Sequence, residues 1–153
     1  MEGKDILEEV KDQFELKGGA PGQYSPLTLA FIGDSVFDAV VKTMIVLKGN
    51  CPVNVLHRRA SSIVKAASQA RMLDEIFESL SDEEKSIYRR GKNAKPYTKA
   101  KNVTYAVYCK ATGLEALTGY LYLCGRTERL TELIKAGIDA LTQSEKSPTS
   151  KFP

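Results

Sequence analysis

The feature that most constrains the fold is a long helical pattern of apolar residues over residues 25–47. Ser25 suits the N-cap of a helix, and Pro26 suits its first position because proline brings a preset φ and lacks the N–H that a helix start leaves unpaired. Asp38 and Lys42 interrupt the apolar run, which therefore falls short of the roughly 20 apolar residues of a membrane span. We expect a long central helix and no contact with a membrane.

The remaining segments repeat the helical spacing, and none alternates apolar and polar residues in the way a strand does. We expect helices over residues 6–16, 53–80 with one break near 61–68, 81–91, 103–123 and 127–141, and a polar loop over 91–101. The chain is predicted to be all-α.

The 153 residues, 42% of them hydrophobic and 27% charged, suit one globular domain. We predict an N-terminal helix and Gly/Pro linker over 1–24, one helical domain over 25–141, and a disordered Ser/Pro/Lys-rich tail over 142–153. The first residues lack the basic and apolar segments of a secretory signal, so we expect a cytoplasmic protein.

Cysteine and histidine chemistry finds little support. Three cysteines without Cys-x-x-Cys spacing favour buried thiols over a disulfide framework or a zinc site. The single histidine, His57, lies beside Arg58 and Arg59, which does not suit the buried base of a serine or cysteine hydrolase.

Positive charge is gathered in two blocks. Residues 39–73 hold six Lys or Arg and no acid, and residues 85–110 hold eight and no acid, although the net charge is only +3. Such segregation creates a positive face that attracts a polyanion, and nucleic acid is the first candidate partner.

Two isolated acids stand out against this background. Asp34 and Asp38 are the only acids between residues 17 and 73, and Glu115 is the only one between residues 85 and 127. Asp34 and Glu115 interrupt helices that otherwise look buried, so each needs a cation, a hydrogen bond or a metal. The alternative to a metal is an ion pair with a neighbouring Lys or Arg; Asp38 is a third ligand or, as we favour, solvated.

A hard cation suits these acids. Oxygen-only ligands favour Mg²⁺, which binds few protein carboxylates because it keeps several waters. Small neighbours would let the two helices approach closely: Gly33, Ser35, Gly113 and Ala116. A metal held by carboxylates beside a cationic surface suits phosphodiester hydrolysis.

These residues resemble a known family. LAFIGDSVFD (residues 29–38) resembles the signature helix of ribonuclease III domains, and LEALTGYLYL (114–123) resembles their second acidic motif. RGKNAK (90–95) is similar to a block of the short Mini-ribonuclease III branch, which lacks a double-stranded-RNA-binding domain. The resemblance covers residues 26–141.

The resemblance implies a Mg²⁺-dependent endoribonuclease that cuts double-stranded RNA as an all-helical homodimer and, in the Mini branch, matures the precursor of large-subunit ribosomal RNA. It makes Asp34 and Glu115 catalytic metal ligands and Phe31 a dimer-interface residue. The basic segment before the second motif is expected to bind RNA through Arg90, Lys92, Asn93, Lys95 and Lys99.

This chain departs from the longer enzymes of the family. Those enzymes carry further acids where this sequence has Leu27, Ala30 and Thr112, so the number of metal ions is left open. Two rival functions also remain: a non-catalytic RNA-binding scaffold on the same fold, and a helical DNA-binding module that reads bases with residues 53–65.

Overall fold

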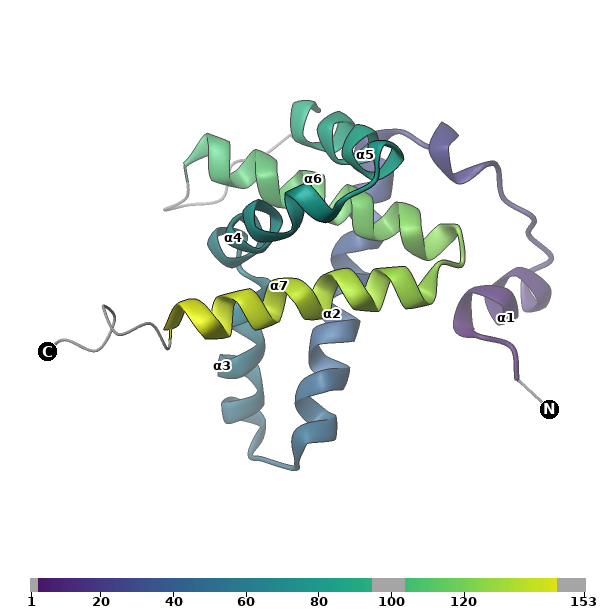
Figure 1. The fold of residues 1–153 in the computed structure, drawn as a ribbon. Helices are drawn as coiled ribbons and strands as arrows, with labels where there is room; N and C mark the ends of the chain where they lie inside the picture. The colour runs from purple at the N-terminus through teal and green to yellow at the C-terminus, as the bar shows by residue number, and fades with distance from the viewer. Residues whose placement is uncertain (1–2, 95–103, 146–153) are drawn as a thin grey trace, which may run out of the picture.

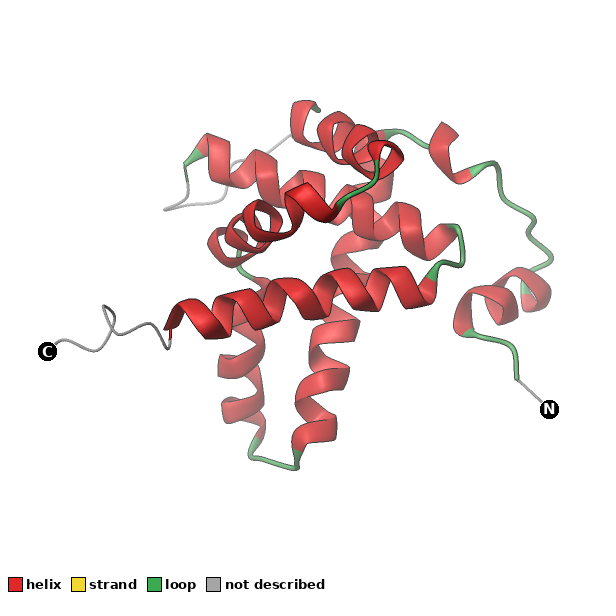
Figure 2. Cartoon of the chain, viewed as in Figure 1, coloured by secondary structure: helices red, strands yellow, loops and turns green. Residues whose placement is uncertain are grey.

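The computed structural model describes residues 3–94 and 104–145, apart from the side chains of 144 and 145. Helices and short loops make up this part of the chain, which contains no strand (Figure 2). The all-α prediction is confirmed. The elements are α1 (Ile6–Gln13), a 3-10 turn η1 (Pro21–Gln23), α2 (Pro26–Lys48), α3 (Val53–Val64), α4 (Ala66–Ile76), a 3-10 turn η2 (Phe77–Ser79), α5 (Asp82–Asn93), α6 (Tyr105–Leu123) and α7 (Thr127–Glu145).

Side-chain caps mark the start of two of these helices. The Ser25 hydroxyl accepts a hydrogen bond from the backbone N–H of Thr28 at 3.2 Å, and Pro26 begins α2. Ser81 and Glu84 form a capping box at the start of α5. These contacts satisfy N–H groups that a helix start would otherwise leave unpaired.

The break predicted within residues 53–80 falls at Lys65, whose extended backbone ends α3 and begins α4. Two buried side chains stabilise the end of α3. The Ser68 hydroxyl donates to the Ser62 carbonyl at 2.6 Å, and the Gln69 amide nitrogen donates to the Val64 carbonyl at 2.8 Å. Helix α4 therefore starts in a fixed position relative to α3.

The centre of the fold is the crossing of α2 and α6 (Figure 1). Helix α6 is covered by α2, α4 and α5, and α7 lies across α4, so most α6 side chains are buried. A helix with apolar residues on every side is typical of such a central position. The fully buried side chains of the core include Leu29, Phe37, Val41, Met72, Leu73, Leu117 and Leu121.

The prediction that a helix ends by Gly91 is wrong. Gly91 is buried inside α5, which continues to Asn93. A Cβ atom at Gly91 would lie 2.6 Å from the Cβ of Ala116 on α6, so this glycine permits close helix packing and does not stop the helix. Lys92 and Asn93 consequently lie on the last turn of α5, and not in the polar loop expected over 91–101.

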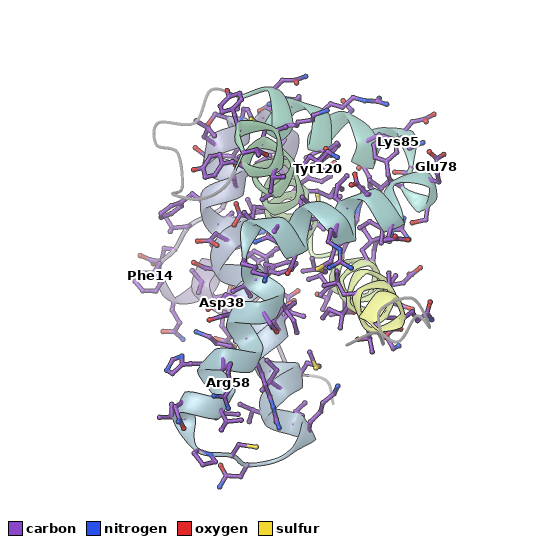
Figure 3. All side chains as sticks on the ribbon, turned by 90° about the vertical axis from the view of Figure 1, so that its left-hand side faces the viewer. Phe14, Asp38, Arg58, Glu78, Lys85 and Tyr120 are labelled. Atoms are coloured by element: carbon purple, nitrogen blue, oxygen red, sulfur yellow. The ribbon has the colours of Figure 1, made fainter. Side chains whose placement is uncertain are left out.

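A helix lies near each end of the described chain, but the N-terminal helix buries no residue. Helix α7 continues to Glu145, so the first residues of the tail predicted over 142–153 are helical. Helix α1 buries no residue, and Phe14 lies at the outer edge of the molecule, on the opposite side from Glu78 and Lys85 (Figure 3). No helix in the described part of the chain is long and apolar enough to cross a membrane.

Candidate active site

Two glycines bring the backbones of α2 and α6 into direct contact. A Cβ atom at Gly33 would lie 1.7 Å from the Glu115 carbonyl oxygen, and one at Gly119 would lie 2.0 Å from the Leu29 carbonyl oxygen. No other residue type leaves room for this crossing. Because Gly33 precedes Asp34 and lies against Glu115, the crossing places the two acids side by side.

The four small residues that were expected to let the two acid-bearing helices approach do not all contribute to that contact. Gly33 does allow α2 and α6 to approach, but Gly113 and Ala116 face α5, where a Cβ at Gly113 would lie 2.6 Å from the ring of Tyr88. Ser35 is exposed. On α6 the residue that permits close contact with α2 is Gly119. The sequence showed it only as a glycine within an apolar helix.

The carboxyl groups of Asp34 and Glu115 lie close enough to interact directly. Asp34 is exposed and Glu115 is half-buried, so the pair lies where the contact between α2 and α6 reaches the protein surface. Burial raises the pKa of Glu115 to about 8, with further contributions from the hydrogen bond and charge of Asp34, while a hydrogen bond from Gln69 lowers it. The raised pKa means that the pair holds a proton at neutral pH unless a cation takes its place.

A protein cation does not fill that role among the described residues. Within 3–94 and 104–143 no ion pair includes Asp34 or Glu115, so the ion-pair alternative gains no support there. Asp38 is paired with Lys42 at 2.9 Å, and its side chain is 39% exposed, which matches the solvated position we favoured. No cluster of three metal-ligating side chains occurs in the same residues.

Gln69, which had no assigned role in the sequence, completes the surroundings of Glu115. It lies on α4, is only 3% exposed, donates to the Val64 carbonyl at 2.8 Å, and lies close enough to Glu115 to lower the pKa of its carboxyl. Its side-chain oxygen is buried without a hydrogen-bond partner. A polar residue in the first turn of α4 was the available signal, but the sequence did not indicate which way it faces.

The donor set fits Mg²⁺. Two carboxylates and a buried amide oxygen without a partner are all hard oxygen donors. Few protein ligands suit an ion that keeps several waters and takes phosphate oxygens from its substrate. Asp34 and Glu115 would hold the ion.

The expected RNA-binding residues occupy different environments. Arg90 donates to the carbonyls of Gly22 at 3.0 Å and Tyr24 at 3.2 Å, and thus fastens the linker to α5. Lys92 and Asn93 are exposed on the last turn of α5. Lys95 and Lys99 lie outside the described residues.

Phe31 is not part of the core of the single chain. It is 79% exposed, and Leu27, one turn before it on α2, is 38% exposed. The two side chains form an apolar surface on the helix that carries Asp34. Contiguous exposed apolar surface, unlike a single exposed residue, is a candidate site of contact with another protein.

Comparison with known proteins identifies the class to which this fold and site belong. The family model described as Ribonuclease III domain matches residues 27–126. The chain is 46% identical to a Mini-ribonuclease 3 of Thermoanaerobacter sp. (strain X514) over 119 residues, which covers 78% of this chain and 84% of the relative. It is also 46% identical to a Mini-ribonuclease 3 of Staphylococcus aureus over 112 residues, 72% of this chain and 84% of the relative.

A solved structure agrees with this relationship. The crystal structure of protein FN1578 from Fusobacterium nucleatum superposes with a TM-score of 0.69 at 30% identity, covering 77% of this chain and 94% of that one. The chain belongs to the ribonuclease III domain family. Within that family it falls in the Mini-ribonuclease 3 branch, as the resemblance of residues 29–38, 90–95 and 114–123 indicated.

Proposed function

We propose that this chain is a Mg²⁺-dependent endoribonuclease that hydrolyses phosphodiester bonds of double-stranded RNA, with the precursor of large-subunit ribosomal RNA as its substrate. Family membership supports the endoribonuclease activity. The observation that carries the proposal is the pair Asp34 and Glu115, which the backbone contact of α2 and α6 holds together beside the buried amide of Gln69.

The proposed hydrolysis depends on a metal ion that Asp34 and Glu115 would hold. A bound Mg²⁺ would polarise a phosphoryl oxygen and lower the pKa of a bound water. Asp34 and Glu115 would hold the ion, and the α2–α6 crossing keeps the two helices that carry them in contact. Burial of Glu115 keeps bulk water from one side of the site, where electrostatic interactions are therefore stronger. A histidine base is not needed.

We further propose a homodimer whose interface includes Phe31. Its exposed ring and the neighbouring Leu27 give an apolar surface one turn from Asp34. Association through this surface would bring the acid pairs of two copies towards one duplex, so that each copy cuts one strand.

RNA binding is assigned to the basic segment that begins on α5. Lys92 and Asn93 are exposed, and Lys95 and Lys99 follow them in the sequence. Arg90 uses two of its five N–H donors for the linker carbonyls, which leaves others for a phosphate. Phosphate contacts of this kind bind the backbone irrespective of sequence.

The test is incubation of the purified chain with long duplex RNA, single-stranded RNA of the same sequence and duplex DNA, each with and without Mg²⁺. We expect that duplex RNA is the only one of the three substrates to be cut, that cutting requires Mg²⁺, and that the products carry 5′-phosphate ends. Binding of duplex RNA without any cutting would favour a non-catalytic scaffold. Base-specific binding of duplex DNA would favour a DNA-binding module.

A further inference from the structure

The side chain of Gln69 lies next to two separate parts of the fold, the end of α3 and the acid pair. Its amide nitrogen donates to the Val64 carbonyl at 2.8 Å and so caps the end of α3. The same side chain lies close enough to Glu115 on α6 to lower the pKa of that carboxyl by hydrogen bonding. An amide nitrogen has two N–H donors, so both contacts can exist at once. Gln69 thereby links the α3–α4 break to the acid pair.

The side-chain oxygen of Gln69 is in an unusual environment. The side-chain oxygen of Gln69 is buried and accepts no hydrogen bond, and it is the only buried side-chain atom of this kind among the described residues. Folded proteins rarely leave such an acceptor unsatisfied, because its burial removes it from water without compensation. An explanation is therefore needed, and the neighbouring acid pair suggests one.

We infer that Gln69 is a positioning residue of the acid pair: its N–H holds the Glu115 carboxylate in place, and its oxygen accepts a hydrogen bond from the water shell of the metal ion bound there. This inference rests on the proposed function, since it requires that Asp34 and Glu115 bind a metal. Mg²⁺ keeps several waters, and each of them is a hydrogen-bond donor. Partners of this kind orient the ligands of metal sites.

A purely structural role is the competing explanation, and the chain offers a matched control for it. Ser68 precedes Gln69 on α4, is 4% exposed, and caps the same end of α3 by donating to the Ser62 carbonyl at 2.6 Å. Among the described residues, the Ser68 hydroxyl bonds to Ser62 and is not one of the groups that shift the pKa of Glu115. Loss of the cap alone should therefore have the same effect through either residue, whereas loss of metal positioning should follow Gln69.

The experiment compares the full-length wild type with Gln69→Met and Ser68→Ala. Methionine preserves the length of the side chain and removes both polar atoms. Mn²⁺ affinity is measured without RNA by electron paramagnetic resonance, and the thermal midpoint is measured in parallel. We expect both variants to melt earlier. We expect Gln69→Met to bind Mn²⁺ roughly 10–100-fold more weakly, the usual effect of removing a partner of a metal ligand, and Ser68→Ala to bind it within about twofold of wild type.

Equal Mn²⁺ affinity in wild type and folded Gln69→Met would overturn the inference and leave the proposed function intact. A wild type that binds no Mn²⁺ would overturn both. Should Gln69→Met not fold, the side-chain amide signals of Gln69 in the ¹⁵N spectrum of the wild type decide. They should shift on addition of Mg²⁺ and stay unchanged in Glu115→Gln. Gln69 signals that stay unmoved in the wild type while the backbone amide signals of Asp34 and Glu115 shift would refute the role.

Discussion

Substitution of Gly33 by alanine tests the helix crossing on which the site depends. The added Cβ would lie 1.7 Å from the Glu115 carbonyl oxygen, 2.7 Å from the Glu115 carbonyl carbon and 2.8 Å from the Gly119 nitrogen. These are backbone atoms, so no flexible side chain can move aside, and the two helices must separate by more than about 1 Å. Overpacking of this kind costs about 1–3 kcal/mol, and rigid neighbours favour the upper end. Alanine regains about 1 kcal/mol of helix propensity, which leaves a net loss of about 2 kcal/mol.

Urea denaturation followed by circular dichroism measures this loss. Gly19→Ala is the control, because no atom lies within 4 Å of the added Cβ there, and its stability should stay within about 0.5 kcal/mol of wild type. Mn²⁺ affinity should fall in Gly33→Ala as well, because the displaced backbone carries Glu115. A Gly33→Ala protein as stable as wild type, with unchanged Mn²⁺ affinity, would refute the close crossing.

Three further predictions concern other parts of the molecule. Arg129 pairs with the buried carboxylate of Glu84 at 2.8 Å, and its hydrogen bond lowers the pKa of Glu84, so Arg129→Met should cost roughly 3 kcal/mol at pH 7. A lowered pKa stabilises the fold only above the ordinary value of about 4.3, so the gap between the thermal midpoints of the two proteins should shrink as the pH falls through and below that value. Phe31→Ala should weaken the dimer in sedimentation by about 3–5 kcal/mol if the ring is well packed there, yet change the stability of the monomer by less than about 0.5 kcal/mol, since the ring is 79% exposed. Replacement of three lysines by alanine should lower the slope of log affinity against log salt by about 0.7–0.9 for each phosphate that the protein no longer binds, with little effect on cleavage at saturating RNA: Lys92, Lys95 and Lys99.

Each of these has an outcome that contradicts it. A constant gap between wild type and Arg129→Met from pH 7 to pH 3 would mean that Glu84 gains nothing from the ion pair. A Phe31→Ala dimer as tight as wild type would move the interface elsewhere. An unchanged salt slope in the lysine variant would shift RNA binding to the other cationic block, where replacement of Arg58, Arg59 and Lys65 provides the matched control.

Local signals in the sequence predicted most of the helices. Ser25 with Pro26, and Ser81 with Glu84, cap their helices through contacts within four residues, and such contacts depend little on the rest of the fold. Gly91 misled the prediction because glycine both ends helices and permits close packing. Only the position of Ala116 on a neighbouring helix distinguishes the two roles.

The candidate site was predicted only in part, for the same reason. Asp34 and Glu115 were visible as isolated acids in apolar helices, where burial of a charge needs an explanation. The contacts of Gln69 with Glu115, and of Arg90 with the carbonyls of the linker, join residues far apart in the chain. Spacing along one helix contains no information on such contacts, and charge alone presented Arg90 as one more RNA-binding cation.

The most direct test of the central claim removes one metal ligand at a time without changing the size of the side chain. Asp34→Asn and Glu115→Gln are assayed for cleavage of duplex RNA, for RNA binding, and for folding by circular dichroism. We predict that each variant folds, binds RNA nearly as well as wild type and loses cleavage, because the metal ligands act on the transition state. Cleavage at a near wild-type rate by either variant would contradict the assignment of the acid pair as the catalytic metal site.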